Sequence, residues 1–382
     1  MPRGVNARTA LRAAPRAAGA RMPASVGARW PRHGWRAQGA RMLRPPNVLI
    51  AIFALAASLP ALAPAARSAA PAGDTPSRVA QLQAEAKTLA PLFKTPLVRD
   101  FLAAVPKLPG VEPRTVYRDS ARTHAWTARQ AEQLPDSVRA KLVSRTLDEQ
   151  FYYDTRYGSP LAYARALEVL GQNGVKSVRG MRVADFGCGM LGQLRLLAEN
   201  GATSIGIDVD PLLAALYSEP GDQGAVGPGS VTLATGQWPA TEEMRRTVGE
   251  QLDLFISKNT LKNGYLHPAR PVDPRLLVHL GVSDSEFVAA LARSVKKGGR
   301  VLIYNLCPAP APPDKTYIPW ADGRCPFPRE MWTGAGFRVL EFDRDDSPAA
   351  RAMGHALGWD QGENGMKLDT DLFATWSLFQ RK

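Results

Sequence analysis

The chain has 382 residues, 45% of them hydrophobic, which is enough for one or two ordinary domains with a buried core. Its formal net charge is +13, but residues 1–66 hold ten arginines, no lysine and no acidic residue. The rest of the chain therefore has 38 of the 48 basic residues against all 35 acidic ones. This near balance gives no reason to expect a nucleic-acid partner, and none is predicted.

The N-terminal leader has the layout of a secretory signal peptide. The uncharged apolar run Val48–Leu59 follows Arg44, and small residues suited to cleavage come next. We therefore predict that translation begins at Met42, that 42–66 is a signal peptide, and that residues 1–41 precede the true start. The predicted location is exported or periplasmic. Two alternatives remain open: an uncleaved segment that anchors the chain in a membrane, and an organellar transit peptide.

The three cysteines, Cys188, Cys307 and Cys325, are too few and too scattered for a disulfide framework, and they lack the spacing of a zinc site. No metal is therefore predicted. Cys307 and Cys325 flank a proline-rich loop and would be able to pair in an exported protein. Cys188 lies inside a glycine turn with no histidine nearby in sequence, so we interpret it as a small residue that fills the turn rather than as a nucleophile.

A linker and a helical extension are predicted after the leader. Residues 67–80 are rich in Ala, Pro and Ser, as linkers are. Apolar residues recur at helical spacing over 81–105, and a second helix is expected from Asp136 to about Glu149. The extension therefore spans 81–150, and its role is not evident from the sequence.

The remaining residues, 151–382, are predicted to form an α/β domain that contains a strand–turn–helix–strand unit. The apolar strand 182–186 ends at the turn Gly187–Gly189, where glycines allow a sharp turn and a close approach to a ligand. A helix follows, and the next strand, 203–207, ends at Asp208. An acid at this place, roughly 20 residues after the glycines, is able to accept hydrogen bonds from both hydroxyls of a ribose.

Two classes of nucleotide cofactor fit this unit. Gly187, Gly189 and Gly192 satisfy the dinucleotide pattern G-x-G-x-x-G. Asp185, however, stands two residues before the first glycine, where its negative charge disfavours a pyrophosphate and suits a sulfonium cofactor with an α-amino group. The acid that ends the second strand is followed by a new helix start at Pro211, which also argues against a dinucleotide.

These residues resemble the class I S-adenosylmethionine-dependent methyltransferases. The resemblance rests on Asp185-x-Gly187-x-Gly189 and on Gly206-Ile207-Asp208-x-x-Pro211. It implies that S-adenosylmethionine is the cofactor, that Asp185 and the glycine turn surround its methionine part, and that Asp208 holds its ribose. The predicted cofactor-binding residues of this unit are Asp185, Gly187, Cys188, Gly189, Asp208 and Val209.

The rest of the domain predicts the sheet. Five further strands are expected over 231–234, 252–257, 300–305, 337–342 and 372–379. Strands that alternate with helices indicate a doubly wound sheet. The last two strands are joined without a strong helix, which predicts an antiparallel final hairpin, a feature that the methyltransferase family also has. The expected fold class is therefore α/β, with a doubly wound, seven-stranded, mostly parallel sheet behind a helical N-terminal extension.

Ligands of doubly wound sheets bind outside the carboxyl ends of the strands, and two such ends carry polar and aromatic residues. After the third strand, Gln237 and Trp238 are predicted to contact adenine, although core packing is an equal alternative for Trp238. The family often has an acid there, which this chain lacks. After the fourth strand, Asn259, Tyr265 and His267 are the predicted catalytic residues. Asn259 is closest to the strand end, and Tyr265 or His267 would remove the proton of a hydroxyl or amine acceptor.

Two more segments are expected beside the acceptor. The aromatic stretch 151–158 is interpreted as a lid, with a site role for Tyr157 and packing for Phe151 and Tyr152. The proline-rich loop 307–328 is interpreted as a substrate wall. The leading hypothesis is methyl transfer from S-adenosylmethionine to a small-molecule substrate. The alternatives are a non-catalytic cofactor-binding or interaction protein on the same fold and, third, a nicotinamide-dependent oxidoreductase.

Overall fold

The computed structural model describes residues 76–155, 158–363 and 365–382. The predicted signal peptide, with its membrane-anchor and transit-peptide alternatives, lies outside the described residues, as does Tyr157. Among the helices of these three ranges, none is long and apolar enough to cross a membrane.

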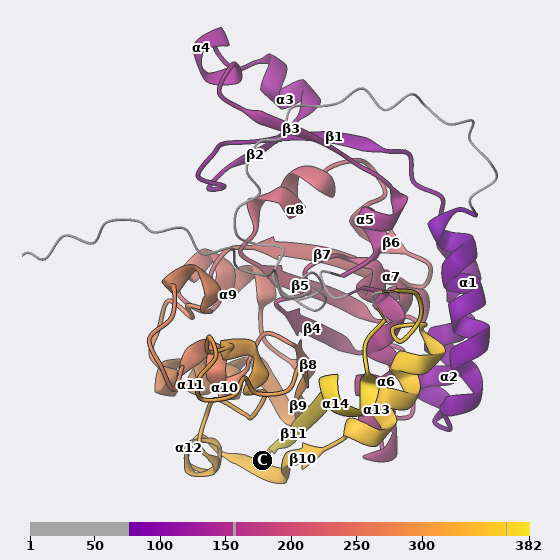
Figure 1. The fold of residues 1–382 in the computed structure, drawn as a ribbon, viewed down its shortest axis with the longest axis vertical. Coiled ribbons are helices and arrows are strands. Elements are labelled where there is room, and N and C mark those ends of the chain that lie inside the picture. The colour runs from indigo at the N-terminus through magenta and orange to yellow at the C-terminus, as the bar shows by residue number, and fades with distance from the viewer. Residues whose placement is uncertain (1–75, 156–157, 364) are drawn as a thin grey trace, which may run out of the picture. The chain divides into compact units, whose positions relative to one another are not determined.

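The core of the α/β domain is a sheet of eight strands. They are β4 (Arg182–Phe186), β5 (Thr203–Asp208), β6 (Gly224–Val226), β7 (Gly229–Thr235), β8 (Leu252–Lys258), β9 (Val295–Cys307), β10 (Phe337–Asp345) and β11 (Phe373–Arg381). Across the sheet they lie in the order β10–β11–β9–β8–β4–β5–β7–β6 (Figure 1). Neighbours from β9 to β7 are parallel, whereas β11 is antiparallel to both β9 and β10, and β6 is antiparallel to β7.

The antiparallel hairpin is confirmed, and the predicted number of strands is wrong by one. The additional strand, β6, is three residues long and pairs with β7 at the edge of the sheet. Without β6, and with the strands numbered along the chain, the order is 3-2-1-4-5-7-6. A classic dinucleotide-binding sheet has the order 3-2-1-4-5-6. Here the last strand inserts antiparallel between the fifth and the sixth, so the sheet departs from the dinucleotide pattern.

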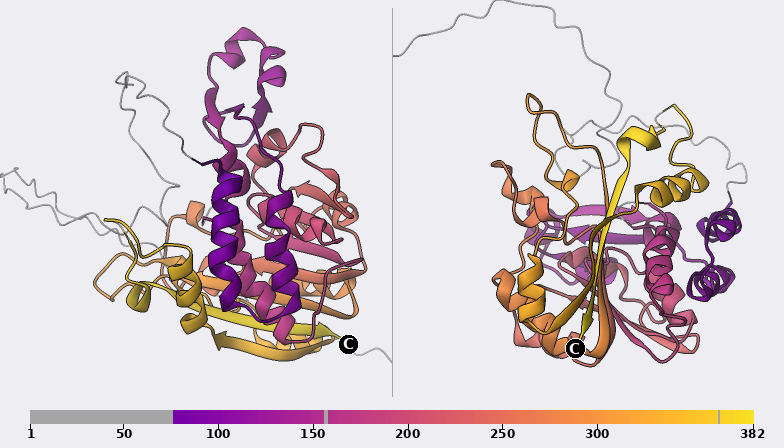
Figure 2. Two further views of the ribbon diagram at one scale, coloured as in Figure 1. Left: turned by 90° about the vertical axis from the view of Figure 1, so that its right-hand side faces the viewer. Right: turned by 90° about the horizontal axis from the view of Figure 1, so that it is seen from below.

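Helices cover both faces of the sheet (Figure 2). One apolar cluster contains residues of α6 (Tyr163–Gln172), α7 (Gly192–Glu199), α8 (Pro211–Leu216) and α13 (Ser347–Ala356); the other contains residues of α9 (Glu242–Val248), α11 (Asp284–Ser294) and α12 (Arg329–Gly334). Successive strand residues alternate between the clusters because their side chains point to opposite faces. Val183 and Leu254 belong to the first cluster, and their neighbours Ala184 and Phe255 to the second.

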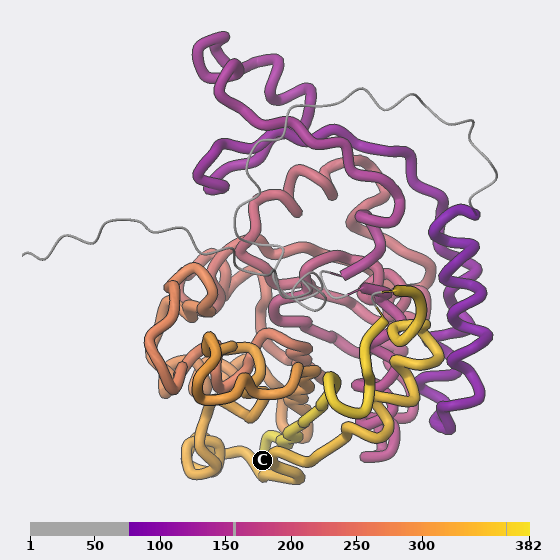
Figure 3. Tube along the Cα trace, viewed as in Figure 1, coloured from indigo at the N-terminus to yellow at the C-terminus, as the bar shows by residue number. Residues whose placement is uncertain are grey.

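The extension is a helical hairpin followed by a small sheet, so it is helical only in part. Its helices are α1 (Arg78–Leu89), which begins inside the predicted linker, and α2 (Pro96–Ala103). Its strands are β1 (Arg114–Arg118), β2 (Ala125–Thr127) and β3 (Val143–Leu147), in the order β2–β1–β3. Figure 3 traces this part of the chain from the indigo helices to the purple segments that follow them.

The helix expected from Asp136 ends early for a tertiary reason. It exists only as α4 (Asp136–Arg139), and the apolar positions that suggested its continuation belong to β3. All five residues of β3 pair antiparallel with β1. This long-range pairing overrides a local helical spacing, as packing against partner strands commonly does.

The remaining short elements are helices and 3₁₀ turns. They are α3 (Ala128–Glu132), α5 (Glu149–Tyr153), α10 (Asn263–Leu266), α14 (Leu368–Asp371), η1 (Ala90–Leu92), η2 (Val105–Lys107), η3 (Pro160–Ala162), η4 (Pro274–Leu276) and η5 (Pro319–Ala321).

Ion pairs join the small sheet to the α/β domain near the end of β5. Arg114 of β1 donates to both carboxylate oxygens of Asp222, at 2.6 and 3.0 Å, and the Tyr152 hydroxyl donates to the same carboxylate at 2.8 Å. Arg118 pairs with Asp210 at 2.9 Å. Because Asp210 is the N-cap of α8, two residues after the predicted ribose acid, the extension supports the backbone on which that acid stands.

Candidate functional site

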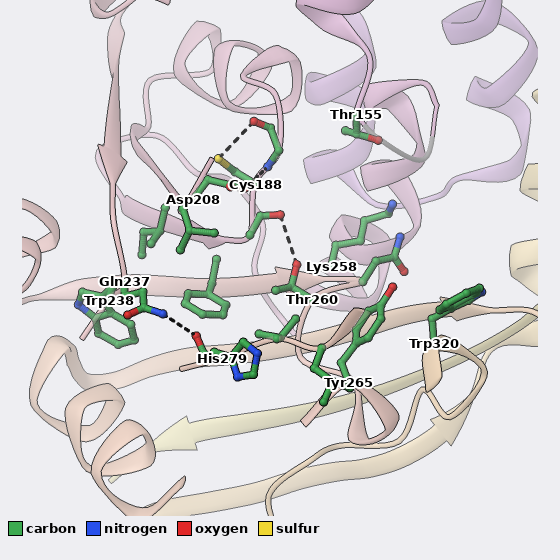
Figure 4. Close-up of a pocket in the computed structure, with 18 of the residues that line it drawn as sticks. Thr155, Cys188, Asp208, Gln237, Trp238, Lys258, Thr260, Tyr265, His279 and Trp320 are labelled. Atoms are coloured by element: carbon green, nitrogen blue, oxygen red, sulfur yellow. Dashed lines mark hydrogen bonds between the residues drawn. The ribbon is translucent and has the colours of Figure 1, made fainter. Parts of the chain in front are cut away.

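A cavity of about 530 Å³ lies at the carboxyl ends of β4, β5, β7 and β8. This volume is typical of small-molecule sites, and the position is where ligands of doubly wound sheets bind. The predicted site residues that line it are Gly187, Cys188, Gly189, Asp208, Val209, Gln237, Trp238, Asn259 and Tyr265. Gln237 and Trp238 lie towards one end, and Lys258 and Trp320 towards the other (Figure 4).

The glycine turn after β4 is built by its own backbone. Gly187 has φ +70° and Gly189 φ +64°, left-handed conformations that glycine adopts without strain. The amides of Gly187 and Cys188 both donate to the carbonyl of Ile207, at 2.8 and 3.2 Å. The amide of Gly189 donates to Asp208 at 2.9 Å. These three amides are thus already bonded, and a side-chain carboxylate occupies the acceptor position at Gly189.

Asp208 stands at the end of β5, as predicted, with one oxygen on the Gly189 amide and the other on the Asp210 amide at 3.0 Å. Burial raises the pKa of Asp208, and the hydrogen bonds from these amides oppose that rise. Val209, the next residue, lines the cavity and is 61% exposed, which is unusual for a large apolar side chain. A carboxylate beside an open apolar surface suits a ribose that carries an aromatic base.

Asp185, which is predicted to contact the cofactor, is not among the residues that line the cavity. It is 1% exposed, and its Oδ2 accepts a hydrogen bond from Gln193 at 3.0 Å. Burial raises the pKa of Asp185 to about 6, against the hydrogen bonds from Gln193 and Tyr163 and the positive charge of Lys258. Both Tyr163 and Lys258 line the cavity. Asp185 therefore acts on the site through them.

Lys258, the last residue of β8, lines the cavity and was not among the predicted residues. Its ammonium lies 5.0 Å from the centroid of the Tyr163 ring, within the range of a cation–π contact. Burial lowers the pKa of Lys258 to about 8, although the charge of Asp185 opposes this. The visible signal was a lysine at the end of a strand whose centre, residues 254–256, is apolar.

The three predicted catalytic residues have different surroundings. Asn259 lines the cavity, but its Oδ1 accepts from the Leu306 amide at 2.7 Å, and its backbone is left-handed with φ +68°. Tyr265 lines the cavity, where it remains a candidate. His267 is not among the lining residues and pairs with Asp284 at 2.9 Å, so the structure does not bring it to the site. Asn259 thus joins two strand ends, which favours a positioning role over a catalytic one.

The two residues after β7 also differ. Gln237 is exposed at the cavity, and its amide nitrogen donates to the His279 carbonyl at 3.3 Å. Trp238 is 1% exposed, and its ring packs against Phe186 and Phe255. Trp238 therefore lines the cavity from within the core, which agrees with the core-packing alternative.

The walls of the cavity come partly from a segment that was not predicted from the sequence and partly from two that were predicted only as whole stretches. Residues 275–279, in the loop that includes η4, line the side near Gln237. Trp320, in the predicted wall loop, lines the opposite end, and Thr155 reaches the cavity from the predicted lid. Tyr152, expected to pack, is 2% exposed.

The cysteines are free and buried. Cys188 fills the glycine turn, and Cys307 and Cys325 are not paired with each other. Burial raises the pKa of all three thiols, that of Cys325 to about 12. This environment disfavours a nucleophilic thiolate at Cys188, in agreement with its interpretation as a small packing residue.

Sequence comparison finds no matching family model and no matching curated protein. Solved structures with a similar arrangement include geranyl diphosphate C-methyltransferase from Streptomyces coelicolor A3(2), with 12% identity, 58% of this chain and 82% of that chain covered, and a TM-score of 0.34. Magnesium protoporphyrin IX methyltransferase from Synechocystis PCC 6803 has 17% identity, 58% and 79% coverage, and a TM-score of 0.32. The [4+2]-cyclase SpnF has 13% identity, 80% and 97% coverage, and a TM-score of 0.34.

Similarities of this size assign neither a substrate nor a reaction to the chain. The class of protein is defined instead by its own fold and cavity. It is a doubly wound α/β protein with an antiparallel final hairpin and a cavity at the carboxyl ends of its parallel strands.

Proposed function

We propose that the protein transfers a methyl group from S-adenosylmethionine to a small-molecule acceptor. The observation that carries this proposal is the placement of Asp208. Asp208 stands at the end of β5, where its carboxylate accepts a hydrogen bond from the Gly189 amide. It lines a cavity of about 530 Å³ beside the exposed Val209. A carboxylate in this position fits the two hydroxyls of a ribose.

The same geometry disfavours a nicotinamide dinucleotide. In a dinucleotide site, free amides of the glycine turn meet a pyrophosphate. Here the amides of Gly187, Cys188 and Gly189 already have acceptors, one of which is a carboxylate. The order of the strands also departs from the dinucleotide sheet. A cofactor that has a ribose but no phosphate agrees better with a glycine turn whose amides are already bonded.

The residues present would hold S-adenosylmethionine along the length of the cavity. Asp208 would bind the ribose, and Val209, Gln237 and the wall 275–279 would enclose the adenine. The sulfonium and methionine end would then lie towards Lys258 and Tyr163, since the ribose joins the base to that end. When bound, the cofactor supplies an electrophilic methyl group. The protein contributes position and exclusion of water, which account for most of the catalysis in such a transfer.

Calorimetry tests the proposal with a matched pair of acids. The wild-type protein should bind S-adenosylmethionine and S-adenosylhomocysteine and should not bind nicotinamide dinucleotides. Asp208→Asn should lower the affinity roughly 10- to 100-fold, the usual loss for a hydrogen bond to a charged group. Asp210→Asn is the control, because Asp210 lies outside the cavity lining, pairs with Arg118, and leaves a residue that still caps α8.

Two results would count against the proposal. Heat from a nicotinamide dinucleotide, with none from either adenosyl compound, would favour the oxidoreductase. Equal losses in Asp208→Asn and Asp210→Asn would place the ligand elsewhere.

A further inference from the structure

Lys258 is a buried cation at the edge of the cavity. It is 4% exposed and lines the cavity at the end near Trp320. Its ammonium lies over the Tyr163 ring, and no residue of the described ranges forms a hydrogen bond or ion pair with it. Lys262, also buried, is different: its ammonium donates to the carbonyls of Leu306 and Trp320, at 2.6 and 3.3 Å, and holds the loop wall in place.

In the described part of the chain, groups from four segments face Lys258. Asp185 on β4 supplies a negative charge, and Tyr163 on α6 supplies an aromatic face. Lys262, in the loop after β8, supplies a repelling positive charge. Tyr304, paired with Lys258 across β8 and β9, directs its hydroxyl away to another acid. A buried cation whose charge is offset by one nearby carboxylate, without a direct ion pair, is sensitive to any further charge brought into the cavity.

We propose that the amine of Lys258 is the general base of this site and that the methyl acceptor is therefore a protic oxygen or nitrogen, a hydroxyl or an amine. This inference rests on the proposed function, because the cofactor would place a positive sulfonium at the same end of the cavity. Two positive charges in one buried space repel, so cofactor binding favours the neutral form of Lys258. The burial that lowers its pKa to about 8 acts in the same direction.

The transfer then conserves charge inside the cavity. The acceptor O–H or N–H proton moves to the lone pair of Lys258 Nζ, and the acceptor atom forms a bond to the methyl carbon as the carbon–sulfur bond breaks and leaves its electron pair on sulfur. One positive charge is lost at sulfur and one is gained at Lys258. A general base works best when its pKa is near the working pH, a condition that an ordinary exposed lysine does not meet.

A different role for Lys258 makes opposite predictions. A lysine that stayed charged to bind an anion, such as the cofactor's carboxylate, would contact S-adenosylmethionine and S-adenosylhomocysteine alike, since both carry that carboxylate. A general base distinguishes them, because only the first carries the sulfonium charge. The comparison of the two adenosyl compounds therefore separates the roles without knowledge of the acceptor.

The experiment is calorimetry of both compounds at pH 7.5 in buffers of different ionisation enthalpy, which counts the protons released on binding. When it binds S-adenosylmethionine, the wild-type protein should release about half a proton or more in excess of the number that Lys258→Met releases. With S-adenosylhomocysteine the two proteins should release the same number of protons. The ratio of the two affinities should shift at least about threefold towards S-adenosylmethionine between pH 7 and 9. Lys315→Met, which removes an exposed lysine outside the cavity, should behave as wild type.

Lys258→Arg is the control for an effect of Lys258→Met on the fold alone. It keeps a charge that does not titrate in this range, so it should bind S-adenosylhomocysteine while the pH-dependent shift disappears. Equal loss of both affinities in Lys258→Met, or an unchanged proton count, would overturn the inference while the proposed function stands. Failure of the wild-type protein to bind either compound would overturn both.

Discussion

A methyl group added at Gly187 should destabilise the protein more than the same group added two residues later. An ideal Cβ at Gly187 would lie 2.6 Å from both Cβ and Cγ2 of Thr260 and still closer to its Oγ1, whereas a Cβ at Gly189 meets nothing within 4 Å. Both glycines have left-handed backbones, at φ +70° and +64°. Gly189→Ala is therefore a matched control that carries the backbone strain without the clash.

The two costs can be separated. An alanine in the left-handed region costs about 1–2 kcal/mol, which both variants should lose. The overlap with Thr260 adds about 1–3 kcal/mol, the usual range for overpacking, so Gly187→Ala should lose about 2–5 kcal/mol in all. Because Thr260 follows the strand that ends at Lys258, relief of this overlap would move the glycine turn away from the strand-end loop and should also weaken cofactor binding.

Urea unfolding of Gly187→Ala, Gly189→Ala, Thr260→Gly and the double variant Gly187→Ala/Thr260→Gly provides the measurement. Removal of the Thr260 side chain should restore part of the stability that Gly187→Ala loses, with a coupling of at least about 1 kcal/mol. A free energy of unfolding for Gly187→Ala within about 0.5 kcal/mol of that for Gly189→Ala, the usual limit for additivity, would refute the predicted contact.

Three further predictions concern charge and burial. Asp222→Ala leaves Arg114 and the Tyr152 hydroxyl without their shared acceptor and should lower the free energy of unfolding by about 3 kcal/mol. Amide hydrogen exchange should become faster first in β1 and β3, and an equal increase throughout the protein would contradict this. Burial raises the pKa of Asp185 to about 6, above its unfolded value of about 4, so the contribution of this carboxyl group to stability is lost as the pH rises between these values. In urea unfolding, the free energy of unfolding of Asp185→Asn should therefore rise relative to that of the wild type between pH 4 and pH 7. A constant difference between the two proteins would argue against the burial. The three buried thiols should resist a thiol reagent at pH 8 in the native protein and react fully in denaturant, and fast labelling of the folded protein would contradict their burial.

Local pattern was sufficient where neighbouring residues decide the structure. The strand 182–186, its glycine turn and the acid at its partner strand were predicted from residues within one β-α-β unit, and the structure has β4, the turn and Asp208 at those positions. Apolar strand periodicity and the two glycines carry this information by themselves, because a buried strand needs apolar residues and a left-handed turn needs glycine. The antiparallel pairing of the last two strands is confirmed, although the prediction expected no strong helix between them and the structure has α13 and α14 there.

Prediction failed where a side chain's surroundings come from distant segments. Asp185 and Trp238 have the chemistry of cofactor contacts, yet Asp185 is buried with a hydrogen bond from Gln193, and the aromatic core surrounds Trp238. His267 lies in the predicted loop but turns to Asp284 instead of the cavity. Residues 143–147, expected to be helical, form β3 instead because all five of them pair with β1.

The sequence by itself determined the strand–turn–helix–strand unit and the doubly wound sheet, since the periodicity of strands and the glycine turn are properties of short segments. Only the tertiary structure decided which polar groups meet in the cavity. Lys258, Tyr163 and Asp185 lie on three elements far apart along the chain, and their packing determines that one lysine is buried beside a carboxylate with its ammonium at the cavity. Burial and neighbouring charge determine the protonation of such a group, and both are set by contacts between distant segments.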